Sequence, residues 1–258
     1  MNTEDPKRRF SPRVSNYQKY RPNYPKEVIK EFLNYLPKKK RSVVADIGSG
    51  TGIFTKRLLD QGMKVYGVEP NDDMRRAAED FLKNYPNFHS VKGSAEKTTL
   101  PDESVDVVTA AQAFHWFNPE PTLKEFQRIL RPEGMVAFVW NERDLEADDF
   151  MKEYNQILLD FCPKYKNSPH LHITKDQILD FIEEITLDEF HFSNEQEFDQ
   201  SGFIGRVLSS SYTPLPRTPE YVPFITALNE LFDKHQQNGK VHISYNTNMY
   251  LGHVHLHF

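Results

Sequence analysis

A carboxylate and three alternate glycines follow a short apolar run early in the chain. The run, Val43–Ile47, is rich in β-branched residues, which favour a buried parallel strand. Every second residue of 48–52 is a glycine, so the backbone can turn sharply and approach a ligand without a Cβ in the way. Asp46 would repel a phosphate but attract an ammonium group, and Ile53 stands where a dinucleotide fingerprint needs its third glycine. The stretch therefore predicts a strand, a turn that binds an amino-acid ammonium group, and a helix.

Later apolar runs also end in residues that bind ligands or move protons. Glu69 ends the second run, where a carboxylate can accept hydrogen bonds from both hydroxyls of a ribose. His115 follows the fourth run, and its intrinsic pKa suits it to take a proton from a substrate; the alternative is a hydrogen-bonded wall residue. Asn141 and Arg143 follow the fifth run and are expected on the substrate side, unless Arg143 is only a surface charge. These residues predict a ligand-binding crevice at the carboxyl edge of a sheet.

Periodicity and turn signals predict an alternation of strands and helices that would hold these residues. The first helix is expected from Pro25 to Pro37. Residues 1–24 are irregular and aromatic, so their rings must dock on another part of the protein. Strands are predicted near 43–47, 64–68, 88–91, 105–110, 135–140, 187–192 and 241–249, and further helices near 52–61, from Asn71, from Pro119, near 147–161, from Thr174, and at 195–209 and 219–237.

Length and composition indicate one domain that is not a general nucleic-acid binder. The chain has 258 residues and a formal net charge of −5, and its basic run 38–41 suits the C-terminal end of a helix. Cys162 is the single cysteine, which excludes an internal disulfide and fits a reducing compartment, so we expect a cytoplasmic protein without a membrane span. His253, His255 and His257 alternate in the tail, but no cysteine or acid accompanies them, so we expect no metal site.

Three segments in one order resemble the class I S-adenosylmethionine (SAM) methyltransferases. They are Asp46 with the glycines of 48–52, the segment 94–96 after the third strand, and Ala111–Trp116 after the fourth. The last segment is similar to the signature of small-molecule methyltransferases of the type 11 and trans-aconitate methyltransferase-like group. The resemblance is strong over about residues 17–143. It implies an α/β Rossmann-like seven-stranded sheet of order 3-2-1-4-5-7-6, with the last strand antiparallel and a helical cap. The core would be about 25–193 and 239–258, and the cap or lid about 1–24 and 194–238.

The same resemblance implies a role for each site residue. The motif Tyr17-x-x-Tyr20-Arg21 matches the segment that folds over the methionine end of SAM, where the rings would face the sulfonium and Arg21 an acceptor carboxylate; the alternative is a frayed terminus. Met74 would pack on adenine, or is an ordinary core methionine, and Glu96 would meet the adenine amino group, or is a solvated loop residue. The implied cofactor contacts are Tyr17, Tyr20, Arg21, Asp46, Gly48, Ser49, Gly50, Gly52, Glu69, Pro70, Met74, Ser94, Ala95, Glu96, Ala111 and Gln112. The implied substrate contacts are His115, Trp116, Trp140, Asn141, Arg143 and Tyr212, with His115 also the candidate catalytic residue.

The expected activity is direct transfer of the SAM methyl group to an oxygen, sulfur, nitrogen or carboxylate of a small molecule. S-adenosylhomocysteine (SAH) would be the product. Positioning and exclusion of water supply most of the acceleration in such a displacement. Two alternatives remain: a SAM-binding or partner-binding module without turnover, and a methyltransferase for tRNA or protein. The acidic balance and the expected cap disfavour the second. We expect a small-molecule partner, no nucleic acid, no membrane, and a monomer or homodimer.

Overall fold

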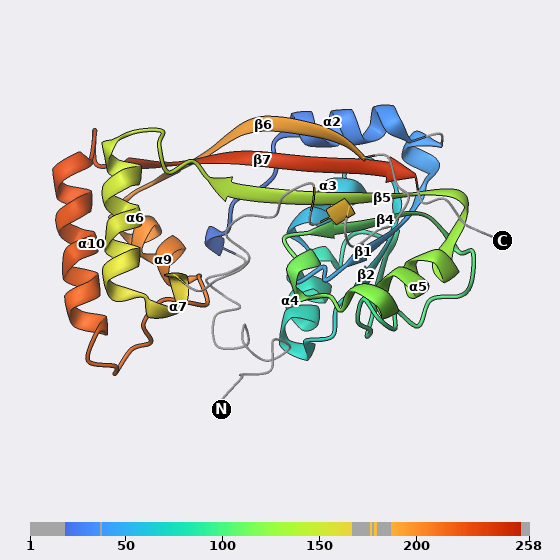
Figure 1. Ribbon diagram of the computed structural model, residues 1–258, viewed down its shortest axis with the longest axis horizontal. Coiled ribbons are helices and arrows are strands. Elements are labelled where there is room, and N and C mark those ends of the chain that lie inside the picture. Colours follow the sequence, from blue (N-terminus) through green and yellow to red (C-terminus); the bar gives the residue numbers. More distant parts are fainter. Residues whose placement is uncertain (1–18, 37, 167–175, 177, 180–186, 254–258) are drawn as a thin grey trace.

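The fold is a seven-stranded sheet with helices on both faces and a separate group of helices at one end (Figure 1). We describe a computed structural model, in which residues 19–36, 38–166, 176, 178–179 and 187–253 are placed. The strand order is β3-β2-β1-β4-β5-β7-β6, which confirms the order that the family resemblance implied. The strands are β1 (Val43–Ile47), β2 (Lys64–Val68), β3 (Phe88–Val91), β4 (Val105–Ala111), β5 (Leu130–Arg143), β6 (Leu187–Phe198) and β7 (Val241–His253).

The first five strands are parallel, and β7 runs antiparallel to both β5 and β6. The predicted antiparallel last strand is therefore confirmed. Both β5 and β6 are longer than the sequence predicted, because each pairs with β7 over most of its length. The register of β6 runs from Leu187 opposite Gly252 to Phe198 opposite Val241. The three long strands carry the sheet beyond the ends of the shorter ones (Figure 1).

Helices cover the two faces of the sheet with different apolar groups. One core joins α2, α3 and Leu82 of α4 to Val44, Val65 and the neighbouring strands. The other core joins Phe126 and Ile129 of α5 to the opposite side of β1, β4 and β5. Both faces are thus closed, which leaves the ends of the strands as the place where a ligand can enter. The helices on the sheet are α2 (Lys26–Tyr35), α3 (Ile53–Leu59), α4 (Asp72–Leu82) and α5 (Pro119–Ile129), with short turns η2 (Lys39–Arg41) and η3 (Phe114–Trp116).

The remaining helices form a cap around the far end of the long strands (Figure 1). They are α6 (Asp149–Phe161), α7 (Pro163–Lys166), α9 (Gln200–Leu208) and α10 (Tyr221–His235). These four helices share one apolar core with Val241, Ile243 and Tyr245 of β7. The cap therefore includes 149–166 as well as 200–235, and this division differs from the expected cap of 194–238. Residues 194–198 belong to β6 instead of starting a helix, and the Asp199 carboxylate caps α9 by accepting from Gly202 N.

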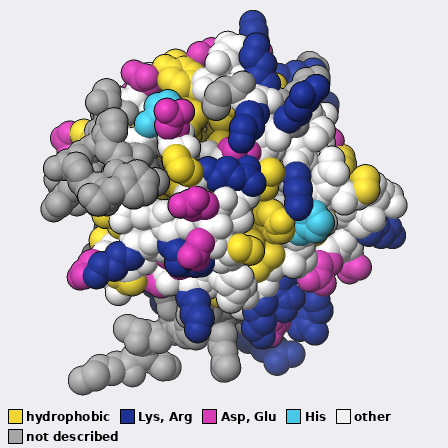
Figure 2. Space-filling view, turned by 90° about the vertical axis from the view of Figure 1, so that its right-hand side faces the viewer, with side chains coloured by type: hydrophobic (Ala, Val, Ile, Leu, Met, Phe, Trp, Pro, Cys, Tyr) yellow, Lys and Arg dark blue, Asp and Glu magenta, His cyan; other side chains and the backbone are white. Residues whose placement is uncertain are grey.

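Some predictions from the sequence fall on residues outside the described ranges. They are the contacts of Tyr17, the helix expected from Thr174, and two of the three tail histidines, His255 and His257. Within the described ranges, no helix combines the length and the hydropathy that a bilayer crossing requires. Figure 2 shows basic and acidic side chains interspersed over one face, with smaller hydrophobic areas between them.

Candidate active site

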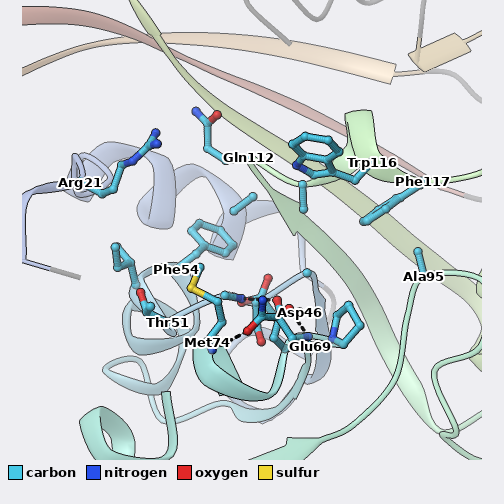
Figure 3. Close-up of a pocket in the computed structure, with 18 of the residues that line it drawn as sticks. Arg21, Asp46, Thr51, Phe54, Glu69, Met74, Ala95, Gln112, Trp116 and Phe117 are labelled. Carbon is cyan, nitrogen blue, oxygen red and sulfur yellow. Dashed lines mark hydrogen bonds between the residues drawn. The ribbon is translucent and has the colours of Figure 1, made fainter. Parts of the chain in front are cut away.

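A cavity opens at the carboxyl ends of β1, β2 and β4, the edge where the sequence predicted a crevice (Figure 3). Its empty volume is about 1350 Å³, including its opening to solvent. The walls come from the strand ends, the N-terminal segment and one cap helix. The lining residues are Arg21, Pro22, Tyr24, Asp46, Gly48, Ser49, Gly50, Thr51, Ile53, Phe54, Glu69, Pro70, Asn71, Met74, Ser94, Ala95, Glu96, Ala111, Gln112, Ala113, Trp116, Phe117, Asn141 and Arg206.

The glycine turn after β1 forms the floor of this cavity. Gly48 has a φ of +68°, and a Cβ there would lie 2.6 Å from the Cβ of Ala113. Gly50 has a φ of +57°, and its Cβ would lie 3.4 Å from the Cε of Met74. Gly48 N and Ser49 N both donate to the carbonyl oxygen of Val68, which ties the turn to β2. A side chain at either glycine would strain the turn and narrow the cavity.

Glu69, at the end of β2, presents a carboxylate that is only partly used by the protein. Its Oε2 accepts from Gly50 N at 2.9 Å, and its Oε1 accepts from Asn71 N at 2.8 Å. A carboxylate has about four acceptor positions, so both oxygens keep capacity for a ligand's donors. The side chain is 8% exposed, and burial raises the pKa of Glu69 to about 6 against the opposing effect of these two backbone donors. The geometry suits a ligand with two adjacent hydroxyl groups.

Asp46 places a second carboxylate in the same part of the cavity. Its Oδ2 accepts from Thr55 Oγ1 at 2.6 Å and its Oδ1 from Thr109 Oγ1 at 2.9 Å. Burial raises the pKa of Asp46 to about 6, although both hydroxyls oppose the shift. Its charge also contributes to the raised pKa of Glu69. Two buried acids side by side make this end of the cavity electronegative, which favours a cationic ligand.

The wall beside Glu69 contains the residues that the resemblance assigned to adenine, Met74, Ala95 and Glu96. Asn71 caps α4 by accepting from Asp73 N and Met74 N, and this cap fixes Met74 at the cavity. Glu96 accepts from Asn118 N at 3.0 Å, so its carboxylate is held by the chain. Sequence reasoning identified Met74, Ala95 and Glu96 but missed the apolar wall residue Phe54 and the polar residues Thr51 and Asn71.

A second end of the cavity lies between the sheet and the cap. In Figure 3, Arg21, Gln112 and Trp116 stand away from Glu69 and Met74. Gln112 has a φ of +58°, and its Nε2 donates to the carbonyl oxygen of Asn141 at 2.9 Å. This bond joins the ends of β4 and β5 at the predicted substrate side. No sequence pattern indicated Arg206 of α9, because only the folded chain brings that helix to the cavity.

Six predicted site residues in the described ranges lie outside the lining of the cavity. Gly52 caps α3 against Leu82, and Trp140 is a core residue with 1% exposure. The His115 ring lies 4.6 Å from the Trp116 ring and 5.8 Å from the Trp140 ring, measured between centroids. His115 is not among the lining residues, but its ring is next to that of Trp116, which lines the cavity. The other three, Tyr20, Arg143 and Tyr212, belong to contacts with or within the cap.

Those three residues show how the cap is held. The Tyr20 ring lies so close to Gly205 of α9 that a Cβ there would overlap it. Arg143 Nη1 donates to Tyr212 Oη at 2.8 Å, which joins the end of β5 to the loop after α9. Direct contact of these residues with cofactor or substrate stays a prediction.

Sheet order, glycine turn and cavity together define a class I methyltransferase fold. Residues 45–138 match the family model of the methyltransferase domain. A solved structure from Anaeromyxobacter dehalogenans, proposed to be a type II methyltransferase, superposes with a TM-score of 0.69. It is 22% identical, and the match covers 92% of this chain and 100% of that one.

Relatives by sequence carry the same family name. An uncharacterized methyltransferase of Mycobacterium tuberculosis is 39% identical over 149 residues, which is 58% of this chain and 58% of that protein. A Saccharomyces cerevisiae protein proposed to be a SAM-dependent methyltransferase is 31% identical over 163 residues, 59% of this chain and 55% of that one. The matched region thus covers less than two thirds of the length of these relatives.

Proposed function

We propose that this chain binds SAM and catalyses transfer of its methyl group to a small molecule. The observation that carries the proposal is the pair of buried carboxylates at the glycine turn, Asp46 and Glu69. A dinucleotide site would place a pyrophosphate at this turn, and the carboxylate of Asp46 would repel it. A nucleoside that also bears cationic groups matches both the charge and the free acceptor positions of Glu69.

The residues present fit SAM in each part. Glu69 would hold the ribose hydroxyls, Met74 and the segment 94–96 the adenine, and Asp46 the ammonium group. The close approach of Met74 to Gly50 leaves room for a ligand only because position 50 has no side chain. When bound, SAM supplies an electrophilic methyl group on a sulfonium.

The part of the chain left to the acceptor is the end of the cavity near Gln112, Trp116 and Asn141. These side chains would orient the acceptor and keep water away, and positioning of this kind accounts for much of the rate in a displacement. Arg21 Nη2 donates to the carbonyl oxygen of Ser209 at 3.1 Å, so the N-terminal segment and the cap close over this end. A covered site supports a small acceptor. Cys162 as the single cysteine fits action in the reducing environment of the cytoplasm. We propose a monomer or a homodimer.

Label transfer tests the proposal directly. The protein is incubated with methyl-labelled SAM and fractionated metabolites, and the labelled product is identified. We expect a small metabolite to acquire label, and Glu69→Ala to reduce SAH affinity by roughly 1 to 3 kcal/mol because it removes charge-assisted hydrogen bonds. Glu230→Ala, at an exposed position of α10, is the matched control and should change neither the label transfer nor the SAH affinity. SAH binding without any label transfer would instead support a SAM-binding module that lacks turnover.

A further inference from the structure

Two arginines at the cap end of the cavity have no carboxylate partner among the described residues. Arg206 of α9 is 4% exposed and lines the cavity. Its Nε donates to Tyr245 Oη at 2.9 Å and its Nη1 to Ser210 Oγ at 3.3 Å. Within the part of the chain that the structure describes, no acceptor lies against Nη2. The guanidinium is therefore buried, charged and held only by neutral hydroxyl groups.

Arg143 stands behind it as a second such charge. Its Nη2 donates to Tyr165 Oη at 3.0 Å, and its Nη1 donates to Tyr212 Oη and, at 3.3 Å, to Tyr154 Oη. The described residues give it no ion pair. Burial raises the pKa of Tyr212, but Arg143 and Arg206 outweigh that effect and hold the pKa below its usual value. Tyr212 thus lies in the positive field of both arginines.

An uncompensated buried charge is costly, and proteins normally pair such charges. The chain pairs a buried charge elsewhere: Asp106, near the amino end of β4, forms ion pairs with Lys38 and Arg131. At the cap end, two guanidinium groups converge with no described acid between them. A ligand with a negative charge would complete this end of the cavity.

We propose that Arg206 binds an anionic group of the methyl acceptor, a carboxylate or a phosphate, and determines specificity for an anionic acceptor. The inference rests on the proposed function, since it names the acceptor class for the same cavity. A guanidinium matches both groups by donating paired hydrogen bonds. Arg143, with Tyr212, acts as a positioning residue that adds positive potential behind Arg206. Arg21 enters from the N-terminal segment and bonds the carbonyl of Ser209, three residues beyond Arg206.

The test titrates anions into protein that is already loaded with SAH. The probes are succinate, benzoate and inorganic phosphate, and calorimetry measures their binding. The first two test whether the site binds a carboxylate, and the third tests whether it binds a phosphate. We expect at least one probe to bind wild-type protein and to bind Arg206→Gln about tenfold or more weakly, because a charge-assisted hydrogen bond is lost. Arg206→Lys should retain part of the affinity. Arg76→Gln, at an exposed position of α4, is the charge-matched control and should bind as wild type does.

Folding and cofactor binding are followed in the same samples. SAH should bind Arg206→Gln as tightly as wild type. Arg206→Met, an apolar side chain of similar length, should melt no lower than wild type in the absence of ligand. An equal loss of SAH affinity in Arg206→Gln would assign Arg206 to the cofactor carboxylate and overturn the proposal. Probes that do not bind wild type, or that bind Arg206→Gln equally well, would also overturn it. Wild-type protein that fails to bind SAH would instead overturn the proposed function, and this inference with it.

Discussion

The two ends of the cavity are built from opposite charges and from different kinds of chain. The end beside the glycine turn carries Asp46, the last residue but one of β1, and Glu69, which directly follows β2. The cap end carries Arg21 and Arg206, which are far apart in the sequence and meet only in the folded chain. The first end is electronegative and the second electropositive. A ligand with a cationic and an anionic part would bind across both.

The difference also concerns stability. At both ends a charge is buried where an apolar residue would be less costly to the fold. Binding sites commonly carry such a cost, because groups arranged for a ligand remain unmatched without it. Substitutions at either end should therefore separate folding from binding.

The largest effect is expected for His115, whose ring is next to that of the lining residue Trp116. For an acceptor that must lose a proton, His115→Gln should lower turnover by about a hundredfold, because a positioned general base contributes that much. The affinity for SAH should stay unchanged, which steady-state kinetics and calorimetry measure together. Unchanged turnover on a hydroxyl, thiol or amine acceptor would assign His115 to the wall alone, where its ring contacts Trp116 and Trp140.

Asp46 should show the stability cost of the acidic end through its pH dependence. Its pKa is raised to about 6 in the folded protein from a reference value of 3.8, so the folded state takes up the proton first as the pH falls. The free energy of unfolding therefore rises as the pH falls from about 6 towards 3.8, because the folded protein binds the proton more tightly. Above pH 6 the fold bears the full cost of burying the charged carboxylate. Asp46→Asn should make the ligand-free protein more stable than wild type by roughly 2 kcal/mol at pH 7.5.

This advantage should shrink between pH 6 and pH 4, where wild-type Asp46 becomes protonated as well. Denaturant unfolding at several pH values measures it, and Asp80→Asn, an exposed position on α4, is the control. If the Asp46→Asn protein is less stable than wild type at pH 7.5, the two threonine hydrogen bonds outweigh the cost of burial.

The smallest effect is expected where the N-terminal segment meets the cap. Binding of SAH should increase amide protection of residues 19–24 in hydrogen exchange, because Arg21 lines the cavity and Tyr20 packs on α9. Gly205→Ala should reduce that protection and weaken SAH binding by about 0.5 to 1 kcal/mol, because its Cβ displaces the Tyr20 ring. Gln200→Ala, at an exposed position on the same helix, should change neither the amide protection nor the SAH affinity. Equal protection with and without SAH would mean that the segment is not a lid.

The acidic end of the cavity was predictable from the sequence, and the cap end was not. Asp46, the glycines and Glu69 were predictable because each sits at the end of an apolar run, and parallel strands bring their carboxyl ends to one edge. The order of the strands came from the family resemblance, since periodicity does not determine which strands are neighbours. The polar end of β6, 193–198, resembled the start of a helix until its pairing with β7 was known.

The cap end was not predictable for a related reason. Arg206 reaches the cavity because β6 continues to Phe198 and α9 begins directly after it, with Asp199 as its N-cap. No local pattern distinguishes that arginine from a surface residue. Arg143 and Tyr212 were predicted to contact substrate, and the structure places them together in the cap, where Arg143 is enclosed by tyrosines.

The ligand that binds between the two acids and the cap defines the activity of the protein. Calorimetry of the wild-type protein with SAH and, separately, with NAD is the most direct measurement. We predict one SAH molecule bound per chain and no detectable binding of NAD, with SAH affinity falling below pH 6 as Glu69 and Asp46 are protonated. Binding of NAD without binding of SAH would contradict the account.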